Sequence, residues 1–417
     1  MAFRFLHLAD VHLDTPFQSK DRQLRVFLRD SIRKAFQKAV DLALSQRVNA
    51  VLIAGDLFDN DTLSFATERF ISEQMKRLMD GDIMVFYAPG NHDPAGDVYR
   101  RSRIQWPDNV KVFSSREPEV CPVYDDRGRL VAYIAGVGHE TQREGANLVQ
   151  KFPCPGDENV PYVGLAHVWV MGSQGEADHD RYAPCTIDDL LGKGYAYWAL
   201  GHIHTRAHLS EHPLVVYPGN LVGRHFREEG QKGAYLVEIN DSGETKAEFY
   251  PLAPVCWSSF RVGDLSEAKS LADLQEHIRE TVIDQMWGDQ GSYDTIVRVF
   301  LEGPSPLYNE LRDEDNIGDL EEYLLVSLGF RYVEVITEEV TRPVIPDKYK
   351  GQPHILGAAL DILEKAKVED DVLMNLKPER LAGCTARDSG EILSYLRDLL
   401  EGMEYDVAAR LLEEDEI

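Results

Sequence analysis

Five short segments of the chain carry side chains whose types and spacing suit metal chemistry, and each segment directly follows an apolar run. In chain order they contain Asp10 and His12; Gly55, Asp56 and Asp59; Gly90, Asn91, His92 and Asp93; His167; and Gly201, His202 and His204. Carboxylate, amide and imidazole groups without a thiolate suit manganese, iron or zinc rather than a structural zinc site. Without a metal, each unpaired polar group in such a buried cluster would cost about 1–3 kcal/mol. The sequence therefore predicts one metal centre built from five segments.

The elements that position these side chains belong to the first 250 residues, where apolar runs alternate with amphipathic stretches. This pattern predicts an α/β domain with the strands RFLHLA, AVLIAGD, IMVFYAPG, VAYIAGVG, YVGLAH, YAYWALGH and LVVYPGN. Crossover helices are expected from Leu24 to Ala43 and from Phe65 to Met79. Because the carboxyl ends of strands form the ligand crevice of an α/β sheet, the five segments can meet at one place. Glycines at 55, 90 and 201 permit tight strand exits.

Beyond about Pro254 the pattern changes to that of a small α+β module. Strands are expected at Trp257–Val262, Tyr293–Leu301 and Arg331–Ile336, and helices at Leu271–Ile283 and Leu320–Leu328. The tract from Thr341 to Pro353 is typical of a linker, and the helices Ala358–Lys367 and Glu391–Leu412 are expected after it. The predicted domains are residues 1–254, 255–340 and 341–417.

Composition limits the classes of function. A net charge of -27 argues against a broad basic surface that grips nucleic acid. A DNA-binding role then requires divalent ions at the chemical site and a partner that supplies basic surface. The five cysteines (Cys121, Cys154, Cys185, Cys256 and Cys384) include no CxxC pair, so buried thiols are expected rather than disulfides or structural zinc. No signal peptide or apolar run of about 18 residues is found, which predicts a cytoplasmic protein that does not bind a membrane.

The five motifs, together with the opening stretch from Ala9 to Phe17, resemble those of the calcineurin-like metallophosphoesterases. Within that family the chain is similar to the SbcD-type DNA repair exonucleases, in a YhaO-like branch. The resemblance covers roughly residues 3 to 240. It implies a metallophosphoesterase β-sandwich flanked by helices, with a small α+β capping domain and C-terminal helices.

The resemblance also implies roles for single residues. One ion would be held by Asp10, His12, Asp56 and His204, and the other by Asp56, Asn91, His167 and His202. Asp56 would then bridge two divalent ions, expected to be Mn²⁺, with iron and zinc as alternatives. His92 resembles the histidine that stabilises the transition state or protonates the leaving oxygen, and Asp93 is a candidate to orient it.

Several residues have alternative interpretations. Asp59 stands where some nucleases of the family carry a histidine, and both Asp14 and Asp59 either orient a ligand histidine or cap a helix or turn. Arg224 and His225 lie in a stretch that departs from the SbcD type and are candidate phosphate contacts. The remaining candidates, and His225 as the alternative to a phosphate contact, are expected to be structural, although the aromatic ones could also stack on bases: His139, His179, His208, His212, His225, Trp169, Tyr182 and Trp198.

The function implied by the resemblance is a manganese-dependent DNA exonuclease and endonuclease that processes double-strand ends, cleaving 3′ to 5′. Its partners would be duplex DNA, a second copy of the chain and an SMC-like coiled-coil ATPase, on which the C-terminal helices dock. Two alternatives stay open. The acidity of the chain favours a phosphatase or small-nucleotide phosphodiesterase on the same metals, and a non-catalytic regulatory subunit of the ATPase is the other.

Overall fold

The computed structural model of the chain describes residues 2–19, 21–59, 63–96, 104–156, 160–173, 180–286, 293–343, 346–376 and 389–411. Contacts between residues divide the chain into two units, Met1–Ser258 with Gly291–Ile296, and Ser259–Gln290 with Val297–Ile417. The three-domain division expected from the sequence stays a prediction.

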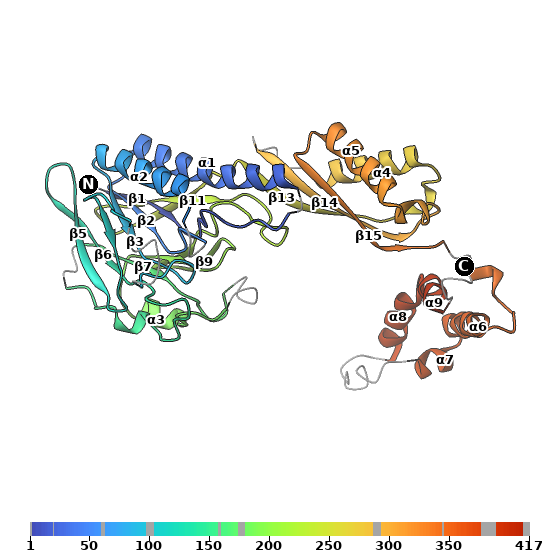
Figure 1. The fold of residues 1–417 in the computed structure, drawn as a ribbon. Coiled ribbons are helices and arrows are strands. Elements are labelled where there is room, and N and C mark those ends of the chain that lie inside the picture. The colour runs from blue at the N-terminus through green and yellow to red at the C-terminus, as the bar shows by residue number, and fades with distance from the viewer. Residues whose placement is uncertain are drawn as a thin grey trace. The chain divides into compact units, whose positions relative to one another are not determined.

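The first unit contains a six-stranded sheet in the order β12-β11-β1-β2-β3-β4 (Figure 1). Its strands are β1 (Phe3–Leu8), β2 (Ala50–Ile53), β3 (Met84–Tyr87), β4 (Val110–Val112), β11 (Gly233–Ile239) and β12 (Thr245–Pro251). Strands β1 to β4 are parallel, whereas β11 and β12 are antiparallel additions. The crossovers after β1 and β2 are helices α1 (Arg22–Gln46) and α2 (Phe65–Asp80), as expected.

A second six-stranded sheet follows in the same unit, in the order β5-β6-β7-β8-β10-β9. Its strands are β5 (Glu119–Tyr124), β6 (Leu130–Gly136), β7 (Tyr162–His167), β8 (Tyr197–Gly201), β9 (Ala207–Glu211) and β10 (Leu214–Tyr217). The four central strands are parallel. Helix α3 (Ile187–Leu191) and the 3-10 turn Val149–Lys151 pack beside this sheet, where they share a core cluster with its outer face.

The main core lies between the two sheets. Phe5 from β1, Phe86 from β3 and Tyr197 from β8 belong to one buried cluster, and the rings of Phe5 and Tyr197 are 5.3 Å apart. The predicted α/β sandwich flanked by helices is therefore confirmed. Trp198 is fully buried on β8, where its indole N–H donates to the Leu190 carbonyl, so it belongs to the core and not to a base-stacking surface.

The second unit contains a three-stranded sheet, β13-β14-β15, and helices. The bounds are β13 (Val255–Val262), β14 (Asp294–Pro304), β15 (Tyr332–Thr341), α4 (Leu271–Gln285), α5 (Glu314–Leu328), α6 (Ile355–Val368), α7 (Asp370–Asn375), α8 (Ser389–Leu400) and α9 (Met403–Leu411). One core cluster joins the sheet to α4 and α5, and another joins helices α6 to α9. The tract expected to be a linker contains a 3-10 turn at Pro346–Lys348.

One expected helix is in fact two. The stretch from Glu391 onward breaks between α8 and α9, because Gly402 adopts a φ of +79° that ends a right-handed helix. Leu412 and the acidic end lie outside the described residues. Cys121, Cys154, Cys185 and Cys256 are free thiols, while Cys384 lies outside the described residues. Among the described residues, no helix is long and apolar enough to cross a membrane.

Candidate metal centre

Backbone hydrogen bonds bring the predicted segments together where their strands end. The Asp10 N–H donates to the Gly55 carbonyl at 3.1 Å, and the His12 N–H donates to the Asp56 carbonyl at 2.9 Å. The segment after β1 thus runs beside the segment after β2. In the second sheet, the Val168 N–H after β7 donates to the Gly201 carbonyl at the end of β8. The two sheets therefore present their polar segments at the same end of the sandwich.

The backbone of these segments is unusual. Asp10, His12, Asp56 and His202 all adopt positive φ angles, of 50°, 53°, 49° and 105°. Non-glycine residues in this region typically store about 1–3 kcal/mol of strain each, and such residues cluster at functional sites.

Two of the expected glycines have a clear steric reason. Gly55 has a φ of +87°, and a Cβ there would lie 2.1 Å from Nδ1 of His167. A Cβ on Gly201 would lie 1.7 Å from the carbonyl oxygen of Ala54. Both glycines allow the ends of strands from different sheets to approach closely enough to share a site.

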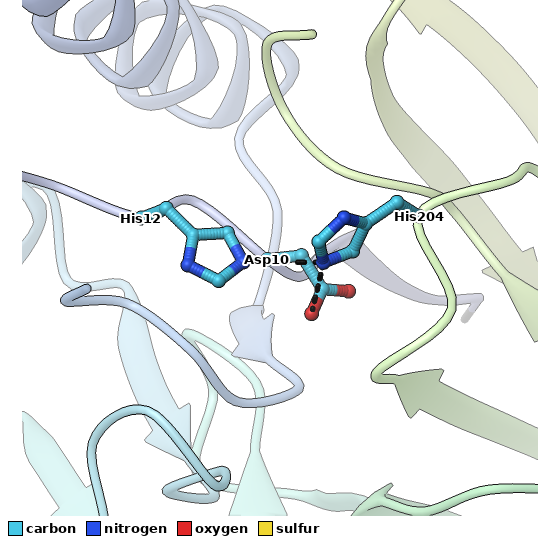
Figure 2. A group of neighbouring side chains, drawn as sticks. All are labelled: Asp10, His12 and His204. Carbon is cyan, nitrogen blue, oxygen red and sulfur yellow. Dashed lines mark hydrogen bonds and ion pairs between the residues drawn. The ribbon is translucent and has the colours of Figure 1, made fainter. Parts of the chain in front are cut away.

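Asp10, His12 and His204 form one half of the cluster. Figure 2 shows the two imidazoles turned toward the Asp10 carboxylate from different segments of the chain. Nε2 of His204 lies 3.7 Å from Oδ1 of Asp10 and 3.2 Å from Nε2 of His12. Nε2 of His12 lies 3.9 Å from Oδ2 of Asp56. Asp56 thus stands beside this group as well as beside the other half.

Asp56, Asn91, His167 and His202 form the other half. Nε2 of His167 lies 3.4 Å from Oδ2 of Asp56 and 3.0 Å from Oδ1 of Asn91. Nδ1 of His202 lies 3.1 Å from the same Asn91 oxygen. The structure therefore brings all seven expected ligands together, with Asp56 between the two halves.

One ring nitrogen of each of the four histidines faces a carboxylate or carbonyl oxygen that is not one of the seven candidate ligands. The anchors are Asp59 Oδ1 for Nδ1 of His12 (3.0 Å), the Ala54 carbonyl for Nδ1 of His167 (2.9 Å), the Asp180 carbonyl for Nε2 of His202 (2.7 Å) and Glu228 Oε1 for Nδ1 of His204 (2.6 Å). Since each anchor can only accept a hydrogen bond, the anchored nitrogen carries the ring proton and the opposite nitrogen of a neutral ring carries the lone pair. All four lone pairs point into the shared cluster. Metal-bound histidines characteristically show this arrangement.

The charge state of the cluster also fits cations. Burial lowers the pKa values of His12, His167 and His204, which keeps these rings neutral. The Nε2 atoms of the neutral His12 and His204 rings face each other at 3.2 Å without a proton between them, so two lone pairs repel each other. A cation bound between the two atoms would remove this repulsion. Burial and the charge of Asp56 raise the pKa of Asp10, another conflict that positive charge would relieve. The donor set therefore fits oxygen- and nitrogen-binding divalent metals.

His92 lies beside the cluster and is 42% exposed. Its Nδ1 is 2.9 Å from Oδ1 of Asp59, and its backbone N–H donates to Asp56. Although burial acts in the opposite direction, the Asp59 hydrogen bond and the Asp56 charge raise the pKa of His92 to about 9. Asp59 therefore contacts both His12 and His92, and this geometry favours the interpretation that it orients a ligand histidine.

Asp93 holds the backbone of the site. Its carboxylate accepts the backbone N–H groups of Asp56 (3.1 Å), Leu57 (2.6 Å), Phe58 (3.2 Å) and Gly90 (2.6 Å), and the hydroxyl of Tyr87. It joins the turns after β2 and β3. The expected task of orienting His92 is instead performed by Asp59. Asp14 accepts the Ser64 backbone N–H at 2.8 Å and the Thr67 hydroxyl at 2.7 Å, while Ser64 itself is the residue that caps α2.

Two anchors were not expected from the sequence. Glu228 accepts from Nδ1 of His204, from Nδ2 of Asn220 and from the backbone N–H of Arg224. The other is the Asp180 carbonyl. One of two adjacent glutamates in a polar stretch and a backbone carbonyl carry no sequence signal. Arg224 and His225 border the cluster, and His225 is 55% exposed.

The remaining histidines and aromatic residues are mostly structural, as expected. Nε2 of His139 bonds the His167 carbonyl at 2.7 Å, and His208 bonds the Tyr235 hydroxyl at 2.9 Å. Trp169 is buried. Tyr182 is half-buried and lines the cavity above the cluster. His212 is exposed, and His179 lies outside the described residues.

A cavity of about 400 Å³ opens onto the cluster. It is lined by Asp56, Asn91, His92, Asp180, Tyr182, His202, His204, Thr205, Arg224, His225, Arg227 and Glu228. A larger cavity of about 830 Å³ lies at the opposite end of the strands, near Leu130 and Tyr162, and contains none of the candidate ligands. A sandwich that places buried carboxylates and imidazoles, with the partly buried Asn91 amide, beneath an open cavity is typical of metal-dependent hydrolases.

Comparisons with known proteins narrow this class. Residues 3–206 match the family model of the calcineurin-like phosphoesterases. The chain is 36% identical over 324 residues to YhaO, an uncharacterized metallophosphoesterase of Bacillus subtilis, covering 77% of this chain and 76% of that one. The chain therefore belongs to the calcineurin-like metallophosphoesterase family, and the predicted family is confirmed.

Two further relatives are named as a DNA double-strand break repair protein and as a nuclease subunit. The DNA double-strand break repair protein Mre11 of Aeropyrum pernix is 41% identical over 265 residues, which cover 58% of each chain. One subunit of the nuclease SbcCD from Escherichia coli is 25% identical over 269 residues, covering 57% of this chain and 65% of that one. The family uses a dinuclear metal centre, so this chain is a metal-dependent phosphoesterase with a candidate ligand cluster.

Proposed function

We propose that the chain is a two-metal phosphodiesterase that cleaves DNA at double-strand ends. The observation that carries the hydrolytic part is the set of four histidines, each anchored by one nitrogen and directing the other into a cluster with Asp10, Asp56 and Asn91. The DNA part is supported by the names of the relatives, Mre11 and the nuclease SbcCD.

The ions would be held by the seven residues in two overlapping sets. The first set is Asp10, His12, Asp56 and His204, and the second is Asp56, Asn91, His167 and His202. Two divalent cations held there, with manganese preferred over iron or zinc, would supply Lewis-acid charge to the phosphoryl group and activate water. The polypeptide contributes fixed lone pairs and a bridging carboxylate.

His92 would deliver the proton that the leaving oxygen needs. Asp59 holds Nδ1 of His92, and the raised pKa keeps the imidazolium form at neutral pH. The other ring nitrogen can then donate its proton to an oxygen in the cavity, in the role of a general acid. Asp59 acts through His92 and His12 and is a positioning residue.

The experiment that tests this proposal is release of nucleotides from linear duplex DNA by protein loaded with Mn²⁺. Loaded protein should shorten duplex DNA from its ends, and an Asp56→Asn variant should not. If loaded protein leaves DNA intact with and without an SMC-like ATPase, yet hydrolyses small phosphodiesters, the DNA assignment is wrong. Association of the C-terminal helices with such an ATPase, and of two copies of the chain, belongs to the same proposal and is measurable by co-purification.

One observation favours a second candidate, a phosphodiesterase for small nucleotides. The net charge of -27 opposes binding of a long polyanion by the isolated chain. A panel of duplex DNA, cyclic nucleotides and p-nitrophenyl esters separates the two. A non-catalytic regulatory role would be supported only if loaded protein hydrolysed none of them.

A further inference from the structure

Arg224 lies on the wall of the cavity above the candidate ligands, between β10 and β11. Its side chain is 17% exposed, and Asp56, Asn91 and His92 line the same cavity. A guanidinium has no lone pair with which to bind a metal. Arg224 therefore borders the reaction space as a cation and not as a ligand.

Glu228 and Asp59 hold this cation in place. The Glu228 carboxylate accepts the backbone N–H of Arg224 at 2.7 Å and Nη2 at 3.2 Å. Nη1 lies 3.5 Å from Oδ1 of Asp59, which is longer than an ordinary hydrogen bond. Burial acts to lower the pKa of Arg224, but the charges of Glu228 and Asp59 raise it by more, so the side chain stays charged.

The acceptors around Arg224 leave much of its hydrogen-bonding capacity unused. Nη2 lies 3.1 Å from Nδ1 of His204, but that nitrogen already gives its proton to Glu228, so two donors face each other. Nε is buried and has no hydrogen-bond partner among the described residues. A planar fork of N–H donors with few acceptors, beside a phosphoester site, fits an oxyanion.

We propose that Arg224 binds a non-bridging oxygen of the reacting phosphate and is a catalytic residue. The proposal rests on phosphoester hydrolysis at this site but not on DNA as the substrate. The fixed charge would act most strongly as the phosphoryl oxygens gain negative charge in the transition state. In a chain of net charge -27, it also supplies the local attraction that an anionic substrate needs.

A structural role for Arg224 makes a different prediction. Beyond the effect of burial, the Arg224 charge lowers the pKa of His204 and of His12. An arginine that served only to keep these rings neutral would change metal binding first. Phosphate binding would then change only in proportion to metal loss. The two roles are separable because metal content and phosphate affinity are independent measurements.

The test compares Arg224→Gln and Arg224→Lys with Arg4→Gln in the full chain loaded with Mn²⁺. Arg4 pairs with Glu238 at 2.7 Å on the β1–β11 strand pair, so its substitution removes one paired charge outside the cavity. Bound manganese is measured by atomic spectroscopy, inorganic phosphate binding by calorimetry, and kcat/KM with bis(p-nitrophenyl) phosphate. Thermal unfolding of each variant is recorded in parallel.

Arg224→Gln is expected to retain its manganese but to bind phosphate about tenfold to a hundredfold more weakly, with at least as large a loss in kcat/KM. Arg224→Lys should recover part of the lost phosphate affinity and kcat/KM. If Arg224→Gln unfolds, Arg224→Lys is compared with the unmodified chain in its place. Arg4→Gln should behave like the unmodified chain. Undiminished phosphate affinity in the manganese-loaded Arg224 variants, or a loss that parallels manganese loss, overturns the proposal. If phosphate binding depends on Arg224 but duplex DNA is never cut, only the DNA assignment fails.

Discussion

Replacement of Glu228 by glutamine is the sharpest test of the anchoring that the structure gives to the metal ligands. Oε1 of Glu228 accepts from His204 at 2.6 Å and from Nη2 of Arg224 at 3.2 Å. Oε2 accepts from Asn220 at 2.7 Å and from the Arg224 backbone at 2.7 Å. Although burial acts in the opposite direction, the hydrogen bond from His204 and the charge of Arg224 hold the pKa of Glu228 well below its usual range. The carboxylate is therefore ionised and fully engaged.

The magnitude follows from these contacts. Each oxygen of Glu228 accepts from two donors. In the glutamine variant one of these oxygens becomes an NH₂ group, which is itself a donor, so two hydrogen bonds are replaced by unfavourable donor–donor contacts. A lost hydrogen bond to a buried charged group typically costs about 1.5–3 kcal/mol, so we expect the free energy of unfolding to fall by about 2–4 kcal/mol. Loss of the carboxylate behind a ligand histidine typically weakens metal affinity by about 10–100-fold, or about 1.4–2.8 kcal/mol.

The assay is a calorimetric Mn²⁺ titration of Glu228→Gln together with urea unfolding. Glu229→Gln is the matched control, because Glu229 is the exposed neighbour and loses the same charge. The control should bind manganese like the unmodified chain. Equal manganese affinity in both variants would refute the assignment of Glu228 as the residue that positions His204. A loss of stability without any change in metal affinity would refute it too, since it would reduce Glu228 to a purely structural residue.

Three further outcomes are expected. His92→Gln should lower kcat by at least about 100-fold with manganese content unchanged, measured by single-turnover hydrolysis; an unchanged rate would exclude His92 as the acid. Asp93→Asn should reduce the free energy of unfolding by about 2–4 kcal/mol in urea, because its carboxylate holds four backbone N–H groups; a neutral change would contradict that role. Burial lowers the pKa of His7 to about 3, so the unfolded chain binds the extra proton below about pH 6.5 and stability falls as the pH drops. Between pH 7 and pH 5 the free energy of unfolding of the unmodified chain should fall by about 2 kcal/mol more than that of His7→Gln. Equal pH dependence of stability in the two proteins would disprove that His7 is buried in its neutral form.

The sequence predicted most of the strands in which apolar runs are continuous, although it missed β11, which is buried along nearly its whole length. The parallel strands β1, β2, β3, β7 and β8 are buried along nearly their whole length, and each was expected. Strands β9 and β12 were not expected, because their burial is only partial and alternates with exposure. Half-exposed antiparallel strands at sheet edges have no apolar run to detect. The break at Gly402 was not expected, because apolar residues continue at helical spacing on both sides of the glycine.

In the candidate site, the ligands could be predicted from the sequence but the groups that hold them could not. The expected ligands follow strand ends, so topology alone could bring Asp10, Asp56 and His167 together. Their anchors could not be predicted, since Glu228 approaches from a loop after β10 and His202 is held by a backbone carbonyl. The same reason explains why Asp59, and not the expected Asp93, contacts the His92 ring. Sequence spacing places both near His92, and only the path of the backbone decides which carboxylate meets the ring.

The strained backbone explains why the ligand residues have so many anchors. Positive φ angles at Asp10, His12, Asp56 and His202 persist only where the surroundings over-determine them. The Asp93 carboxylate fixes the Asp56 N–H, and the Asp10 carboxylate accepts the His202 N–H at 3.1–3.2 Å. These contacts lie within the polypeptide, so folding itself assembles the ligand set. Metal binding then adds charge to a site that is already formed, and the strain is compensated by hydrogen bonds that do not depend on the ions.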